Sequence, residues 1–253
     1  FDRAGVDTLT HCVYLRTQAY YDSKVIEVAG DLTPEAVKPW HYGHYWHWHE
    51  SLRRLIAEGS DPPKVIAALC HKRGMRYLPS FRLNDIHGMH PHEGNYGSFR
   101  RDHPEWVFHG KAMNYAVPQV REHVLSVARE LAENYDIDGL DFDFMRWPIY
   151  FKNDEVVANT PVMTQFIRQL RAILDQAGKR LNRRMLLSVR VPMRLGEGKV
   201  INGGATSGTT TKTISMKSRK KPRTNITIIV MTSAPHLPPG IEWRMSATMS
   251  SPP

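Results

Sequence analysis

The feature that most constrains the fold is a regular alternation of strand-like and helix-like segments over the first 198 residues. Alternation of this kind predicts a parallel sheet whose strands are joined by right-handed helical crossovers. In such folds, the functional site lies where the strands end. The expected strands are 5–15, 75–81, 137–144 and 185–191, and the expected helices are 50–58, 62–73, 118–135 and 160–180.

Four strand-helix units in about 200 residues are half of what an eight-stranded barrel requires, because a complete barrel takes roughly 250 residues. The predicted fold class is therefore α/β, with residues 1–198 forming a partial (β/α)8 TIM barrel of parallel strands. The helix near residue 62 is expected to begin at Asp61, with Pro62 and Pro63 in its first turn, and to stop at Gly74.

Residues 199–253 differ in composition from the preceding chain and are rich in Ser, Thr, Lys and Pro. They hold eight Lys or Arg against one acidic residue, Glu242, so they carry +7 of the net charge of +9. We expect a non-homologous or disordered tail, and either a natural basic tail or a frameshift artefact near Gly198, which replaces the real sequence, explains the composition. Within the tail, only 226–231 has a strand-like pattern, and the sequence offers it no evident partner.

Composition argues against several classes of protein. The basic charge sits in the tail, so it does not predict a nucleic-acid-binding face on the main body. No apolar run approaches the roughly 20 residues of a membrane helix. Two cysteines, Cys12 and Cys70, are too few for a disulfide framework, and we expect buried free thiols. The chain opens at Phe1 without a signal peptide, so secretion after removal of an upstream signal stays a hypothesis.

The run DIDGLDFDFMRWP (136–148) contains the most specific pattern for a functional site. Because side chains alternate along a strand, Leu140, Phe142 and Phe144 should face the outer helices, while Asp141 and Asp143 should point inward. Inward carboxylates cost several kcal/mol unless they are paired, hydrogen-bonded or hydrated. A wet, substrate-sized cavity over Asp143 would supply that hydration, and Asp141, one layer deeper, would orient or tune Asp143.

A second interpretation is that the two aspartates bind arginine or lysine partners inside the barrel for structural reasons. A glycosidase also needs two carboxyl groups flanking the scissile bond. Asp141 and Asp143 project from one wall, so the partner should come from elsewhere, and Asp85 and Glu93 are the available candidates.

Polar residues also follow the strand at 75–81. Arg82, Asn84, Asp85 and His87 carry guanidinium, amide, carboxylate and imidazole groups, which suit sugar hydroxyls or a carboxylated sugar. A self-capping polar loop is the alternative. The loop formed by His87, His90 and His92 also admits a metal-dependent hydrolase, although its spacing matches no standard zinc motif, and we expect neither metal nor other cofactor.

Aromatic residues at 40–50 add a further candidate for substrate binding. Trp46 and Trp48 could stack on sugar rings, or could form a hydrophobic plug over a barrel mouth. Arg146 follows the carboxylate strand directly and is expected to bind substrate as well.

SFRLNDIHG, the run NYAVPQVREHVLSVARELAENYDIDGLDFDFMRWP and LLSVRVP together resemble the glycosyl-hydrolase-like 10 family, over about residues 4–195. The members of that family are mostly bacterial TIM-barrel proteins assigned as carbohydrate-active, so the resemblance implies this fold and this activity. Related barrel glycosidases often place a catalytic Asp at the carboxyl end of the corresponding strand, which is the position of Asp143 here. DGLDFDFM also resembles the chitinase pattern DGxDxDxE. Met145 replaces its acidic Glu, and a thioether cannot donate a proton, which argues against chitinase-type chemistry.

These observations predict an enzyme, a glycoside hydrolase that cleaves O-glycosidic bonds of an oligo- or polysaccharide. Asp143 would be the nucleophile or base with Asp141 supporting it, and the partner would be a carbohydrate, not a nucleic acid or a membrane. The alternatives are a non-catalytic carbohydrate-binding barrel and the metal-dependent hydrolase. The polypeptide is expected to be a fragment of such a barrel.

Overall fold

The computed structural model describes residues 5–31, 43–86, 97–190 and 226–227 of the chain. Its main sheet has the strand order β2-β1-β3-β6-β7-β8. The four longer strands, β1 (Thr8–Leu15), β3 (Arg76–Arg82), β6 (Gly139–Asp143) and β7 (Leu186–Arg190), are parallel neighbours in that order. The predicted α/β class, with consecutive parallel strands of a partial (β/α) barrel, is confirmed.

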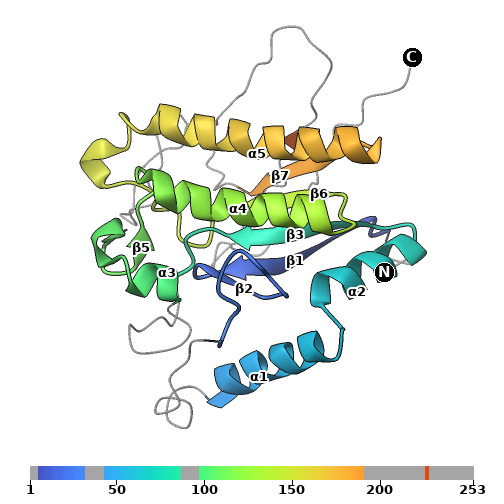
Figure 1. Cartoon of the computed structure of the whole chain (residues 1–253). Coiled ribbons are helices and arrows are strands. Elements are labelled where there is room, and N and C mark those ends of the chain that lie inside the picture. Colours follow the sequence, from blue (N-terminus) through green and yellow to red (C-terminus); the bar gives the residue numbers. More distant parts are fainter. Residues whose placement is uncertain (1–4, 32–42, 87–96, 191–225, 228–253) are drawn as a thin grey trace, which may run out of the picture.

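Helices connect these strands and lie along the sheet (Figure 1). The helices are α1 (Gly43–Ala57), α2 (Pro62–Lys72), α3 (Ser98–Arg101), α4 (Pro118–Asn134) and α5 (Thr160–Leu181), with 3-10 turns η4 (Pro104–Trp106) and η5 (Asn153–Glu155). The short strands are β2 (Gln18–Ala19), β4 (Val107–Phe108), β5 (Ala112–Met113) and β8 (Ile226–Thr227). No helix in the described ranges is long and apolar enough to cross a membrane.

One face of the sheet packs against α4 and α5, which lie side by side over it (Figure 1). Leu140, Phe142 and Phe144 are buried in this apolar core, as the strand alternation predicts. Phe142 stacks on Phe81 of the neighbouring strand with ring centroids 4.6 Å apart. The opposite face of β6 therefore carries Asp141 and Asp143.

Gly139 allows β6 and β7 to approach closely where the carboxylate strand begins. A Cβ at this position would lie 2.2 Å from the backbone oxygen of Leu186, which no side chain tolerates. Glycine thus fixes the pairing of Gly139 with Leu186, and this register sets which residues of β7 stand beside the two aspartates.

The structure differs from the sequence predictions at the aromatic segment. The sequence predicted a helix from residue 50, but α1 already begins at Gly43. Burial of His49 and Leu52 against Tyr20, Val28 and neighbouring residues stabilises these turns through tertiary packing, which overrides their modest helix propensity. The expected loop after β3 likewise contains short elements, α3, η4 and the β4–β5 hairpin.

The tail contributes β8, whose residues pair in parallel with Leu187 and Ser188 of β7. The expectation that this segment lacks a partner was therefore wrong, because β7 presents an open edge to it. Residues 199–225 and 228–253 lie outside the described ranges, and the division of the chain at residue 198 stays a prediction.

Asp61 occupies the N-cap position of α2, as predicted, but its side chain makes no capping hydrogen bond. Its carboxylate instead accepts hydrogen bonds from the Asp22 backbone N–H at 3.1 Å and the Tyr135 hydroxyl at 2.8 Å. Asp61 thus ties the loop after β2 and the end of α4 to the start of α2.

His123 on α4 predicts a pH-dependent stability. Its ring stacks on Phe99 at 3.9 Å and its Nε2 lies 3.2 Å from the Thr17 carbonyl oxygen. Burial, assisted by the positive charge of Arg100, lowers the pKa of His123 to about 4. The unfolded imidazole titrates near 6.5, so between these values the unfolded chain binds the proton and stability falls as pH decreases.

His123→Gln should therefore reduce the loss of unfolding free energy between pH 7 and pH 4.5 by about 2.5 kcal/mol. The measurement is urea unfolding at both pH values. His47→Gln is the matched control, since its side chain is 79% exposed, and should leave the pH dependence unchanged. An identical pH dependence in the parent and His123→Gln would contradict this assignment.

Candidate functional site

The strand registers align polar side chains into two rows on the face of the sheet opposite α4 and α5. Ser80, Asp141 and Ser188 are direct neighbours on β3, β6 and β7. One layer nearer the carboxyl ends, Arg82, Asp143 and Arg190 are neighbours in the same way. Side chains at one level of a parallel sheet share a face, so each aspartate lies between two polar partners.

The deeper carboxylate, Asp141, is completely buried and bonded on both of its oxygens. Ser188 donates to Oδ1 at 2.8 Å, and Ser80 donates to Oδ2 at 2.6 Å. Arg190 adds donors to Oδ2 from Nε at 3.0 Å and Nη2 at 2.8 Å, and its Nη2 also donates to the Ser80 hydroxyl at 2.6 Å. This arrangement matches the interpretation that the inward acids have basic partners inside the fold.

Asp143 has fewer partners, although it is only 2% exposed. Its Oδ1 accepts a hydrogen bond from the Met145 backbone N–H at 2.8 Å. Its Oδ2 lies 3.3 Å from Nη1 of Arg190. One guanidinium therefore connects both carboxylates, and Asp143, at the end of β6, receives the weaker share.

A second charged cluster, of one carboxylate and two guanidinium groups, lies where β3 ends. Asp85 is 1% exposed, and its Oδ2 lies 3.5 Å from Nη1 of Arg82 and 3.3 Å from Nε of Arg146. The structure thus brings together three residues from the predicted substrate-binding set, and places them beside the row that contains Asp143.

Asn84, predicted to bind substrate, is completely buried and bonded to backbone groups. Its Nδ2 donates to the carbonyl oxygens of Met113 at 3.1 Å and Ile149 at 2.5 Å, and its Oδ1 accepts from the Met113 N–H at 3.0 Å. Both amide hydrogens are used, so in this geometry Asn84 connects the loops after β3 and β6, and its predicted substrate binding stays a prediction.

Sequence reasoning missed two residues around Asp143, Arg190 and Tyr150, of which Arg190 is the more important. Burial, followed by the charge of Asp143, raises the pKa of Tyr150 and keeps its phenol protonated.

Burial also raises the pKa of Cys12 to about 11, with smaller effects from the charges of Arg82, Asp85 and Arg190. Cys12 pairs with Ser80 across β1 and β3, so it is a protonated thiol beside the polar rows. Both cysteines are free, as expected, with Cys70 buried and Cys12 partly buried.

Trp48 lies away from the carboxylates. Its side chain is 52% exposed and its ring lies 5.5 Å from that of Tyr20, which follows the edge strand β2. Three strand spacings separate β2 from β6, roughly 14 Å. Trp48 therefore does not lie beside Asp143, and its role in stacking on a sugar ring stays a prediction.

Several predicted residues cannot be placed. His87, His90, His92 and Glu93 lie outside the described ranges, as does the side chain of Trp46 on α1. Within the described ranges, no group of three His, Cys, Asp or Glu side chains could hold a metal ion. The histidine-loop hypothesis is therefore untested.

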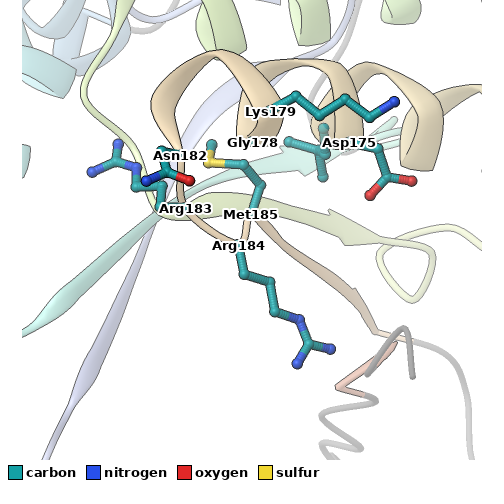
Figure 2. A pocket seen from close by; sticks show the side chains of 8 residues that line it. Asp175, Gly178, Lys179, Asn182, Arg183, Arg184 and Met185 are labelled. Atoms are coloured by element: carbon teal, nitrogen blue, oxygen red, sulfur yellow. The ribbon is translucent and has the colours of Figure 1, made fainter. Parts of the chain in front are cut away.

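A hollow of about 560 Å³ lies at the amino-terminal end of β7, between the last turns of α5 and the start of that strand (Figure 2). Its lining includes Asp175, Lys179, Asn182, Arg183 and Arg184. These residues precede β7, whereas Asp143 lies at the carboxyl ends of the strands. The cavity expected over Asp143 stays a prediction.

Comparison with known proteins gives weak but consistent matches. No family model matches the chain, so membership of the glycosyl-hydrolase-like 10 family stays a prediction. The 1,4-alpha-glucan branching enzyme GlgB of Bacillus caldolyticus is 26% identical over 109 residues, which cover 40% of this chain and 16% of that enzyme.

Two solved structures match part of the chain at low identity. Maltogenic alpha-amylase AmyB of Thermotoga neapolitana is 18% identical, with 53% of this chain and 28% of that one covered and a TM-score of 0.31. Chitinase ChiW of Paenibacillus sp. is 15% identical, with 75% and 14% covered and a TM-score of 0.39. The chain thus spans less than a third of each of these proteins.

Arg190 should be essential for stability, because removing one partner of a buried ion pair leaves an uncompensated charge. Arg190→Gln is expected to lower the unfolding free energy by about 3–5 kcal/mol, measured by chemical denaturation. Arg129→Gln is the control, since Arg129 pairs with Glu122 on the surface of α4, and should change stability by about 0.5 kcal/mol at most. Equal effects in the two variants would show that Arg190 does not hold the aspartates.

Proposed function

We propose that the chain is part of a carbohydrate-active enzyme that cleaves O-glycosidic bonds, with Asp143 as the group that attacks the sugar or activates water. The observation that carries this proposal is the placement of Asp143. It is an inward carboxylate at the carboxyl end of a parallel strand, held by a guanidinium beside a second acid-arginine cluster. The similarity to carbohydrate-active proteins supports the same class of reaction.

Charge complementarity provides the chemical argument. Asp141 and Asp143 share Arg190, so this buried group carries one net negative charge. Glycoside cleavage proceeds through an oxocarbenium-like transition state, in which positive charge develops on the sugar ring. A fixed negative charge near that ring stabilises the transition state more than the neutral substrate, which is the requirement for catalysis.

The residues around Asp143 have distinct roles in this proposal. Ser80 and Ser188 fix Asp141, Asp141 fixes Arg190, and Arg190 orients Asp143. Asp141 is thereby a positioning residue, because all of its contacts are internal. Asp85 forms ion pairs with Arg82 and Arg146, and we assign it to holding these arginines at the site, where they bind substrate.

The proton donor is a separate group. Asp141 and Asp85 are both engaged by arginine in the described part of the chain, and neither is assigned to proton donation. Glu93, which lies outside the described ranges, keeps its place as the candidate second carboxyl group.

Asp143→Asn should abolish hydrolysis while the fold is retained, because the amide is neutral and a weak nucleophile. We expect turnover to fall by at least about 10³-fold, measured as reducing ends released from a panel of α-glucans, β-glucans and acidic polysaccharides. Asp175→Asn is the control, since it replaces an exposed carboxylate on α5, and should leave turnover unchanged. Equal turnover of the parent chain and Asp143→Asn on a cleaved glycan would reject the role of Asp143.

A second candidate function is non-catalytic carbohydrate binding. The observation that favours it is the engagement of both Asp143 oxygens, by Met145 and Arg190, in a side chain that is only 2% exposed. An exposed aromatic ring such as Trp48 would then supply the sugar-stacking surface.

The two functions are separated by Trp48→Ala. Under the binding hypothesis, affinity for an immobilised polysaccharide should fall about tenfold, since an aromatic ring that stacks on a sugar contributes on the order of 1 kcal/mol or more to the binding free energy. Asp143→Asn should leave the affinity unchanged in that case. Val157→Ala, an exposed apolar truncation elsewhere, is the control in affinity electrophoresis, and unaltered retardation of Trp48→Ala would exclude this surface.

A further inference from the structure

Arg82 and Arg146 meet at a single carboxylate oxygen. Arg82 stands at the end of β3 and Arg146 follows β6, so different strands deliver the two guanidiniums to one place. Their separations from Asp85 Oδ2 are 3.5 Å and 3.3 Å. Charge-assisted hydrogen bonds between guanidinium and carboxylate usually lie near 2.7–2.9 Å, so Asp85 satisfies neither arginine fully.

The exposure of these side chains differs in a consistent direction. The Asp85 side chain is 2% exposed, whereas those of Arg82 and Arg146 are 37% and 42% exposed. The carboxylate is thus buried, and the two arginine side chains that contact it reach the surface. Because one negative charge faces two positive charges, this cluster has an excess positive charge at its solvent-facing side.

The neighbouring row carries one net negative charge, because Asp141 and Asp143 share Arg190. In the described part of the chain, however, both acids pair with Arg190, and neither forms an ion pair with Arg82 or Arg146. In the described part of the chain, Asp85 is the acidic partner of both Arg82 and Arg146. Each arginine carries five donors in a fixed planar arrangement, and one contact to Asp85 leaves most of them available to a ligand.

We propose that Arg82 and Arg146 together bind the carboxylate of an acidic sugar, so that the substrate or ligand is a uronate-bearing glycan. This inference rests on the proposed function for its location, since it places the anionic group beside Asp143. A planar carboxylate accepts paired hydrogen bonds from guanidinium groups, which a neutral hydroxyl cannot do. Binding at Arg82 and Arg146 also pairs the ligand's negative charge with positive groups.

The test compares a carboxylate with its neutral ester on the same sugar. Isothermal titration of the full chain would use oligogalacturonate, oligoglucuronate and oligomannuronate, each as the free acid and as the methyl ester. At least one free acid should bind about tenfold more tightly than its ester. The difference should shrink as salt rises from about 0.05 to 0.5 M, because salt screens exposed charges.

Variants locate the effect. Arg82→Gln/Arg146→Gln should lose the preference for the free acid, whereas Arg82→Lys/Arg146→Lys should retain part of it, because charge remains without the planar donors. Arg129→Gln, a surface arginine on α4, is the control and should bind like the parent chain. Circular dichroism establishes that each variant is folded.

The outcomes separate this inference from the proposed function. Equal binding of acid and ester, absence of uronate binding, or a preference that survives Arg82→Gln/Arg146→Gln would overturn it. Cleavage of a neutral glycan that depends on Asp143 would leave the hydrolase proposal standing without this inference. Binding of a uronate without cleavage, unaffected by Asp143→Asn, would retain this inference and remove the hydrolase proposal.

Discussion

Arg190 and the two carboxylates that it joins are the interaction on which the carboxyl-terminal edge of the sheet depends. Asp141 and Asp143 are inward, charged and almost completely buried, and an uncompensated buried carboxylate costs several kcal/mol. Arg190 compensates both, and it does so from the adjacent strand, at the register position directly beside Asp143. The pairing of β6 with β7 is therefore a requirement of the charge arrangement as well as of backbone hydrogen bonding.

One face of the sheet requires apolar side chains and the other holds polar ones, and the alternating side chains of β6 supply both. Leu140 and Phe142 pack into the apolar core beneath the helices, while the alternate residues form the polar rows. A shift of one residue in register would bury the carboxylates among apolar side chains and expose the phenylalanine to the polar rows. Gly139 opposes such a shift, because only a residue without a Cβ fits against Leu186.

Local patterns predicted much of this fold. The four parallel strands, the helices after them and the inward direction of Asp141 and Asp143 follow from periodicity. Arg190 was missed because it lies 47 residues beyond Asp143 in the sequence, and only the strand register brings them together. The helical state of 43–50 was missed because packing of His49 and Leu52 decides it. The backbone contacts of Asn84 depend on where two distant loops return, which no local pattern specifies.

The two carboxylates of β6 differ in the number of close hydrogen-bond partners, and this difference bears on whether each has a structural or a chemical role. Asp141 has two serine hydroxyls and two guanidinium nitrogens within 3.0 Å. Asp143, one layer nearer the strand ends, has one backbone N–H and one guanidinium nitrogen at 3.3 Å. A purely structural pair needs only the deeper, well-bonded carboxylate to anchor Arg190. The second carboxylate adds a buried negative charge with weaker compensation, at the edge where folds of this class place their sites. Stability alone does not account for such a group, whereas the catalytic role that we propose for Asp143 would.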